Sequence, residues 1–299
     1  MRTYLYLTYR CNCNCFFCAS DETNIITHDN EICFEDVKRF LIKSPDKQHL
    51  IISGGEPTIH KDFLKIVEFA KRYYENITLL TNGIKFSDIE FLQRTIDMGV
   101  NRISIPFYTP IKEEHNQMVG NPASFDNVMA CLSNLNALIT NNSIDVRIKL
   151  LLARFTYRTI PDSIEYIVSN FPNIRRLSLN GLHIGEKALK HSSDSVMNYS
   201  EARLYNDLII EKLLYYKFDF QLCDVPLCAF SRAIVKKLLT LKKIAYVDEA
   251  FLKRPDAKSK VVSTSAYGPK ECNSCSLSNM CPKIYGKNAS IFNYGLNPF

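Results

Sequence analysis

Four cysteines lie close together near the start of the chain: Cys11, Cys13, Cys15 and Cys18. Three of them, Cys11, Cys15 and Cys18, follow the spacing CxxxCxxC directly after an apolar stretch that favours a β-strand. Thiolates bind soft metals, and three from one loop can hold three corners of an iron–sulfur cube. The fourth iron would then be open to a small molecule. A zinc ion is the alternative, because the same ligands suit it. We expect Cys13, which lies off this spacing, not to be a ligand and to point its side chain away from the cube.

A second motif, SGGEP at residues 53–57, follows the next predicted strand. In parallel α/β folds, ligands bind at the carboxyl ends of the strands. Gly54 and Gly55 would let the backbone approach a ligand closely, and the Glu56 carboxylate could accept hydrogen bonds from an ammonium group. Alone, the motif could be a tight turn with an incidental acid. Next to a CxxxCxxC loop it favours a binding site.

These motifs need a scaffold, and the first two thirds of the chain alternate apolar strands with amphipathic helices. This alternation predicts an α/β fold with a parallel sheet covered by helices, either a partial (β/α)6 barrel or an open sheet. Beyond residue 216 the pattern changes to a cysteine-rich segment. We therefore expect two domains, residues 1–216 and 217–299. The predicted strand–helix units are 3–9 with 34–42, 49–53 with 61–74, 77–81 with 86–98, 101–107 with 124–139, 145–155 with 160–171, and 174–180 with 199–216.

The composition indicates a globular protein that acts in the cytoplasm. Of its 299 residues, 46% are hydrophobic and 23% are charged, and no apolar run reaches the roughly 18 residues that cross a bilayer. Eleven cysteines in a reducing compartment indicate metal binding or catalysis rather than disulfides. The net charge of +6 is mild, and the basic stretches 236–243 and 253–260 fit solvated surfaces better than an acidic substrate. Without interleaved aromatics or a recognition motif, we expect no nucleic-acid binding, and we expect no membrane partner.

Together the motifs resemble the radical SAM superfamily over roughly residues 3–185. The resemblance rests on Cys11, Cys15, Cys18, on Phe17 before the last cysteine, and on GGEP at 54–57; TNG at 81–83 and RLSLNGLHIG at 176–185 are weaker echoes. It implies a 4Fe–4S cluster on the three cysteines, whose open iron binds S-adenosylmethionine. One electron would cleave this cofactor to methionine and a 5′-deoxyadenosyl radical, which abstracts hydrogen from a substrate.

The resemblance also assigns roles to single residues. Gly54, Gly55 and Glu56 would hold the methionine amino group, Phe17 would flank the adenine, Ser104 would lie near the ribose, and Asn180 near the adenine edge. Pro57 and Thr81 belong to the same expected cofactor site. From strand alternation, Arg147 and Lys149 share one face and could contact the cofactor carboxylate or the substrate; a solvent-facing strand end is the equal alternative.

The tail cysteines Cys272, Cys275 and Cys281, with Cys223 and Cys228 upstream, resemble the SPASM and twitch extensions of radical SAM enzymes, which bind auxiliary clusters. Tyr285 stands where the full SPASM pattern has a further cysteine. We therefore expect one auxiliary 4Fe–4S cluster on Cys228, Cys272, Cys275 and Cys281, with Cys223 left over. The alternative is a structural zinc site on the same thiolates.

These features predict a peptide maturase-like enzyme that crosslinks or oxidises a peptide or a natural product. A fully ligated auxiliary cluster could accept the second electron of an oxidation. A molybdenum-cofactor-type GTP cyclase is the alternative, although the segment between Cys272 and Cys281 contains no Arg for a triphosphate. A non-enzymatic metal-binding scaffold is the other alternative. As partners we expect the substrate and a one-electron donor such as flavodoxin or ferredoxin.

Overall fold

A computed structural model describes residues 2–19, 31–139, 144–245, 250–254, 257–262, 266–268, 270–285, 294–296 and 299. One ten-stranded sheet runs through the described residues in the order β10-β9-β1-β2-β3-β4-β5-β6-β7-β8. Its strands are β1 (Arg2–Tyr6), β2 (His49–Ser53), β3 (Asn76–Leu80), β4 (Arg102–Phe107), β5 (Asp145–Leu152), β6 (Arg176–Gly181), β7 (Asp219–Cys223), β8 (Ile244–Ala245), β9 (Ala250–Arg254) and β10 (Ala257–Val262).

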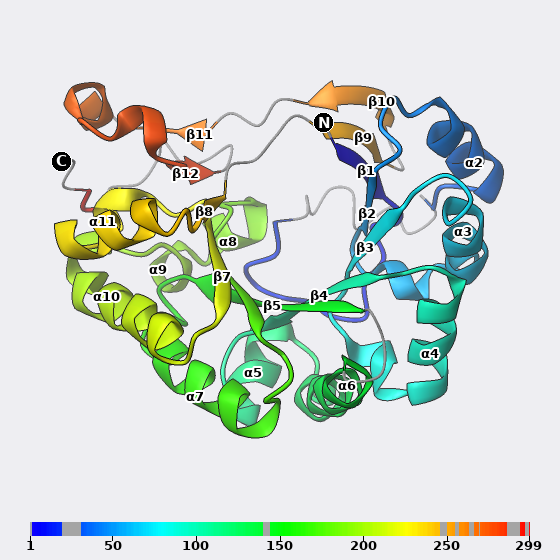
Figure 1. Ribbon diagram of the computed structural model, residues 1–299, viewed down its shortest axis with the longest axis horizontal. Helices are drawn as coiled ribbons and strands as arrows, with labels where there is room; N and C mark the ends of the chain where they lie inside the picture. Colours follow the sequence, from blue (N-terminus) through cyan, green and yellow to red (C-terminus); the bar gives the residue numbers. More distant parts are fainter. Residues whose placement is uncertain are drawn as a thin grey trace.

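The first six strands confirm the predicted order, since each pairs in parallel with the next. The sheet curves without closing on itself, which confirms the partial barrel (Figure 1). The strands form where β-branched and large apolar residues cluster, and alternate residues then bury against the helices. In β5, for example, the even-numbered residues from Val146 to Leu152 are buried and the odd-numbered ones are partly exposed.

Helices cover the outer face of this sheet (Figure 1). They include α2 (Phe34–Lys43), α3 (Phe63–Ala70), α4 (Ile89–Met98), α6 (Ser124–Ile139), α7 (Ile160–Asn170), α10 (Tyr199–Tyr215) and α11 (Arg232–Thr240). The short helices α5 (Lys112–Val119) and α8 (Glu186–Lys190) instead contact residues 14–17, and α9 (Ser192–Ser195) follows α8. Local signals set their ends. Asp88 caps α4 by accepting from the amides of Glu90 and Phe91, and Gly99, with φ 129°, ends it.

Four strands of the sheet lie beyond the predicted units. β7 and β8 extend it in parallel past β6, while β9 adds in parallel to the far side of β1 and β10 pairs antiparallel with β9. β8 has only two residues, too few for a strand pattern to stand out in the sequence. Because β7 and β8 continue the barrel sheet, the sheet does not end at residue 216. The division into domains 1–216 and 217–299 stays a prediction.

The described residues from β11 (Ala266–Tyr267) onward, which we call the tail, lie beside β8 and α11, at the opposite edge of the sheet from β9 and β10 (Figure 1). The tail contains the two-stranded sheet of β11 and β12 (Ile284–Tyr285), with the short 3-10 helices η4 (Lys270–Ser274) and η5 (Ser278–Met280) between them. Among the described residues, no helix is both long and apolar enough to span a bilayer.

Candidate functional site

The cysteine-rich loop leaves the carboxyl end of β1 and is fastened to the end of α5. The backbone amide of Asn14 donates to the Val119 carbonyl at 2.8 Å, and the backbone amide of Phe16 donates to the Met118 carbonyl at 3.3 Å. Gly120, with φ 61°, permits this close approach, because a Cβ at this position would lie 2.9 Å from the Asn14 carbonyl oxygen. The loop is therefore held by backbone contacts that do not depend on the cysteine side chains.

The side chains of Cys11, Cys13 and Cys15 lie near one another, and the Cys18 backbone amide donates to the Cys15 carbonyl at 3.2 Å. The Asn82 side-chain amide lies 3.9 Å from Cys11 Sγ and 3.6 Å from Cys13 Sγ. The Cys13 backbone amide donates to Cys11 Sγ at 3.4 Å. The Cys13 side chain lies beside those of Cys11 and Cys15, and its exclusion from the cluster ligands stays a prediction.

The two glycines of SGGEP are required by this same loop. A Cβ on Gly54 would lie 2.6 Å from the carbonyl oxygen of Thr8, and one on Gly55 would lie 2.3 Å from that of Arg10. Instead, the backbone amide of Gly55 donates to the Thr8 carbonyl at 2.7 Å, and the backbone amide of Glu56 donates to the Arg10 carbonyl at 2.8 Å. The glycines thus let the end of β2 pack directly against the backbone that leads into the cysteines.

Glu56 is fully buried and joins the ends of β2 and β3. One carboxylate oxygen accepts from the amide (3.0 Å) and hydroxyl (2.6 Å) of Thr58 and from the hydroxyl of Thr81 (2.7 Å). The other oxygen accepts from the Asn82 backbone amide at 2.7 Å. Burial raises the pKa of Glu56, while these hydrogen bonds oppose that shift. Asn82, part of the TNG motif but not among the predicted site residues, thus contacts both the carboxylate and the cysteine group.

An aromatic cluster covers the cysteines on their other side. Phe17 is stacked on Phe155 with ring centroids 4.8 Å apart, and it meets Tyr108 edge-on at 5.0 Å. Burial, and next the nearby cysteine sulfurs, raise the pKa of Tyr108. Tyr108 follows β4 directly, so a site residue could have been sought at that strand end. Phe17 is buried among these rings, where it separates the cysteine group from water on that side.

The remaining predicted cofactor residues lie on the inner side of the sheet or at its carboxyl edge. Ser104 is buried in β4, and its carbonyl accepts from the Thr81 amide at 3.3 Å. Arg147 does not reach solvent freely: its guanidinium donates to the Gln221 side chain of β7 at 2.8 Å. Asn180 accepts from the Ser178 hydroxyl at 2.8 Å. Pro57 is buried in the 3-10 helix η1 (Pro57–Ile59) that follows Glu56.

Lys149 shares the inner face of β5 with Arg147. Burial lowers the pKa of its amine, and nearby Cys223 and Asp224 partly oppose that shift. At the adjoining strand ends, His183 Nε2 lies 3.1 Å from an Asp224 carboxylate oxygen. The ends of β5, β6 and β7 thus carry polar groups suited to substrate contacts. His60 and His115 differ, since both are buried and contact the Ile32 carbonyl and the Ser124 hydroxyl, respectively.

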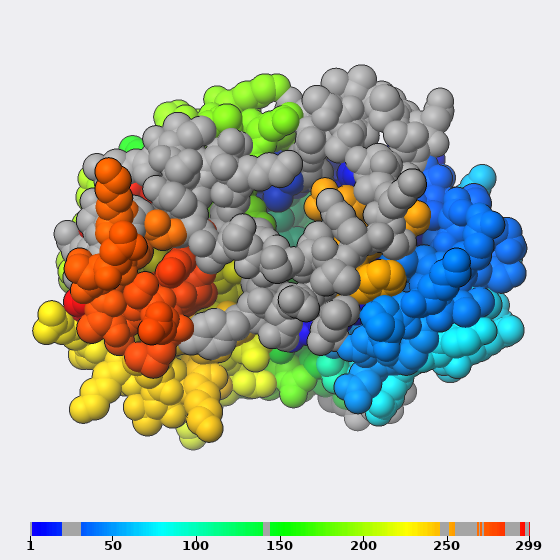
Figure 2. Space-filling view, turned by 90° about the horizontal axis from the view of Figure 1, so that it is seen from above, coloured from blue at the N-terminus to red at the C-terminus, as the bar shows by residue number. Residues whose placement is uncertain are grey.

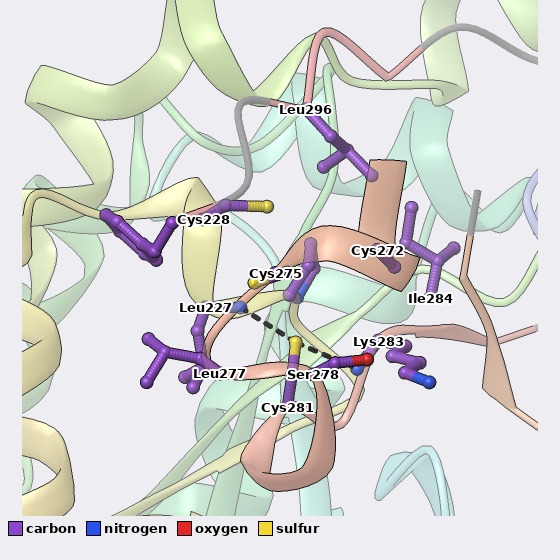
Figure 3. A pocket seen from close by; sticks show the side chains of 12 residues that line it. Leu227, Cys228, Cys272, Cys275, Leu277, Ser278, Cys281, Lys283, Ile284 and Leu296 are labelled. Atoms are coloured by element: carbon purple, nitrogen blue, oxygen red, sulfur yellow. Dashed lines mark hydrogen bonds between the residues drawn. The ribbon is translucent and has the colours of Figure 1, made fainter. Parts of the chain in front are cut away.

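A second sulfur-rich site lies where the tail meets the 3-10 helix Leu227–Ala229, between β7 and α11. Cys228, Cys272, Cys275 and Cys281 line one pocket together with apolar side chains (Figure 3). Cys281 Sγ accepts from the amides of Leu227 at 3.3 Å and Lys283 at 3.4 Å. Within the described part of the chain, no three His, Cys, Asp or Glu side chains lie close enough to hold a single metal ion. Cys223 is not among the residues that line this pocket; it ends β7 beside Asp224.

Known structures share this fold. SuiB of Streptococcus suis, in its complex with S-adenosylmethionine, superposes with a TM-score of 0.57 over 75% of this chain and 50% of its own, at 16% identity. The complex of SuiB with the precursor peptide SuiA gives 0.57 over 74% of this chain and 48% of its own, at 17% identity. HydG of Carboxydothermus hydrogenoformans, an FeFe-hydrogenase maturase, superposes with a TM-score of 0.54 over 85% of this chain and 61% of its own, at 11% identity.

Curated proteins match at the level of sequence. An AdoMet-dependent heme synthase of Methanosarcina barkeri is 29% identical over 126 residues, which are 42% of this chain and 36% of the relative. A probable GTP 3′,8-cyclase of Saccharolobus islandicus is 25% identical over 193 residues, 63% of this chain and 60% of the relative. The chain thus spans between about a third and three fifths of the length of these relatives.

The radical SAM superfamily model matches residues 5–166, more than half of the chain. This range contains the cysteine loop, the GGEP turn and the aromatic cluster described above. The chain therefore belongs to the radical SAM superfamily, whose enzymes bind a 4Fe–4S cluster and S-adenosylmethionine.

Proposed function

We propose that this radical SAM enzyme modifies a peptide or a peptide-derived natural product, by crosslinking or by two-electron oxidation. The observation that carries the proposal is the tail pocket with its four cysteines, Cys228, Cys272, Cys275 and Cys281. Four thiolates would complete the coordination of an auxiliary 4Fe–4S cluster and leave no iron for substrate. Such a centre suits electron transfer, which an oxidation needs for its second electron.

The N-terminal residues fit the S-adenosylmethionine-binding cluster. Cys11, Cys15 and Cys18 supply three thiolates from one loop, and the CxxxCxxC spacing leaves one corner for the cofactor. When bound, the cluster supplies the electron that cleaves S-adenosylmethionine. Cys13 lies beside the same sulfurs, and a Cys13→Ser variant tests whether it is a ligand.

The chain's own residues position the cofactor and keep water out. The Glu56 carboxylate fixes the turn after β2, and its hydrogen bonds to Thr81 and Asn82 hold the ends of β2 and β3 together. Phe17 and Tyr108 close the site on the side of α5. Excluding water in this way protects a reactive radical from side reactions. Arg147 and Asn180 face the interior, where they can contact the cofactor.

The tail pocket fits an auxiliary cluster by its chemistry as well as its count of donors. Leu227, Leu277 and Phe299 contribute apolar walls, and two backbone amides point at Cys281 Sγ. Hydrogen bonds to cluster sulfurs and burial set the potential of an iron–sulfur centre. A structural zinc ion would use the same four thiolates, so metal content must be measured.

The peptide class is favoured by the described SuiB complex, which holds a precursor peptide. The fold likeness by itself does not decide a substrate. GTP is the second candidate, because probable GTP 3′,8-cyclases match up to 63% of this chain. Against GTP, no arginine lies between Cys272 and Cys281, whereas a triphosphate favours guanidinium groups.

The first experiment measures metals and cofactor cleavage on anaerobically purified protein. We expect about eight irons per chain and little zinc, and 5′-deoxyadenosine formed after dithionite and S-adenosylmethionine are added. Cys275→Ala should lower the iron count to about four, while Cys223→Ala, its matched control, keeps about eight. Zinc in place of the second four irons would overturn the auxiliary cluster. If both clusters are intact but no 5′-deoxyadenosine forms, the protein is instead a non-enzymatic metal-binding scaffold.

A second experiment separates the two substrates. The enzyme is incubated with S-adenosylmethionine and dithionite in two separate reactions. One contains GTP, and the other contains candidate precursor peptides encoded near its gene. The proposal expects a mass change of a peptide and no consumption of GTP. GTP-dependent formation of a cyclised nucleotide would establish GTP cyclisation as the reaction and refute peptide modification.

A further inference from the structure

Helix α11 and the residues after it form a basic surface, which we call the α11 basic face: Arg232, Lys236, Lys237, Lys242 and Lys243. Residues 232–243 contain these five cations and no Asp or Glu, in a chain whose total net charge is +6. The helix is amphipathic. Ile234, Val235 and Leu238 are buried, whereas Arg232, Lys236, Lys237 and Lys242 are exposed.

Few acidic groups neutralise this face. Lys243 Nζ lies 3.3 Å from an Asp219 carboxylate oxygen. Lys236, Lys237 and Lys242 have no acidic partner among the described residues. A row of exposed like charges repels itself and therefore lowers stability. Such a row is consistent with a surface that meets an acidic partner.

The α11 basic face is directly connected to the tail pocket. Cys228, which lines that pocket, lies three residues before Ser231, the N-cap of α11. The Arg232 guanidinium lies 5.7 Å from the ring centroid of Phe299, and Phe299 also lines the pocket. In the view from above, the yellow surface that contains α11 adjoins the orange-red surface of the tail (Figure 2).

The pocket itself lies near the surface. Cys272, Cys275 and Cys281 each keep partial exposure, and Met280, next to Cys281, is 42% exposed. Leu241, at the end of α11, is 48% exposed. An electron could therefore pass between the pocket and a protein docked on α11. The exposed apolar side chains beside the cations provide what a small transient interface uses: charge to steer and apolar area to contact.

We propose that the α11 basic face is the docking surface for an acidic one-electron carrier protein, which exchanges electrons with the iron–sulfur centre of the tail pocket. This inference rests on the proposed function, because it needs that centre. In the step, the reduced carrier loses one electron and the centre gains it, and no proton or group moves. The reverse transfer returns to an oxidised carrier the electron that a substrate oxidation releases.

The test uses the reconstituted holoenzyme and, as the probe, flavodoxin hydroquinone. Its oxidation is followed by stopped-flow flavin absorbance at several salt concentrations. We expect Lys236→Glu/Lys237→Glu to lower the second-order rate constant on the order of tenfold at low salt. The difference should shrink as added salt shortens the Debye length below about 10 Å.

The matched control is Arg72→Glu/Arg94→Glu, which reverses two exposed cations near α3 and α4, far from α11 (Figure 1). It should keep the wild-type rate. Iron content and reduction by dithionite, a small reductant that needs no docking surface, should be the same in all three proteins. An unchanged flavodoxin rate in the α11 variant, or an equal loss in the control, would overturn the docking surface. If dithionite itself gives no 5′-deoxyadenosine, the proposed function fails, whatever the flavodoxin rates are.

Discussion

Replacing Glu56 with Gln tests whether this carboxylate is a structural centre of the site as well as a cofactor ligand. All four groups that hydrogen-bond to this carboxylate are donors. In Glu56→Gln, the side-chain NH2 group takes the place of the oxygen that accepts from the Asn82 backbone amide at 2.7 Å. That buried amide loses its acceptor, which costs about 1–3 kcal/mol. The three bonds at the other oxygen lose their ionic character, and with it part of their strength.

Together these changes should lower the free energy of unfolding by about 2–4 kcal/mol. We would measure urea unfolding of the cluster-free protein by circular dichroism, with no S-adenosylmethionine present. For an m-value of about 2–3 kcal/mol per molar, the midpoint should fall by about 1 M urea. Glu68→Gln, an exposed change of the same chemistry in α3, should shift it by less than about 0.5 kcal/mol.

Equal midpoints for the two variants would refute this reasoning. They would show that the hydrogen bonds around Glu56 do not stabilise the empty site. If Glu56→Gln then weakened S-adenosylmethionine binding by the reconstituted protein, its role would be that of a ligand alone. Loss of both stability and binding would show that the carboxylate serves both purposes.

Three further predictions concern the same region and the core. Gly55→Ala should reduce iron retention and cost about 1–3 kcal/mol of stability, because its Cβ would lie 2.3 Å from the Arg10 carbonyl oxygen; full iron content would contradict the packing argument. Cys13→Ser should retain the S-adenosylmethionine-binding cluster in anaerobic iron assays, whereas Cys15→Ser should lose it; loss in both would make Cys13 a ligand. Burial lowers the pKa of His49 to about 4, against about 6.5 in the unfolded chain. The unfolded state therefore binds more protons between these values, so stability falls as pH drops from about 6.5 to 4. His49→Gln should flatten that dependence in urea titrations, and an unchanged slope would exclude His49 as its source.

Much of the fold was predictable because each strand and helix carries its own signal. The six predicted strands pair in the expected order, since apolar strands separated by helices must cross over in parallel. The missed strands are short, or they add to the sheet far from their sequence neighbours. β9 pairs with β1 across more than 240 residues, and no local pattern indicates such a partner.

The sequence by itself determined which chemical groups gather at the site, because the carboxyl ends of parallel strands meet at one edge. Cys11, Glu56 and Thr81 each follow such an end, so their meeting could be expected from motif order alone. Only the tertiary structure decided how those groups share contacts. Side-chain direction and hydrogen bonding depend on neighbours distant in the chain, and this is why Cys13 joins the cysteine group, Asn82 contacts Glu56, and Cys228 rather than Cys223 lines the tail pocket.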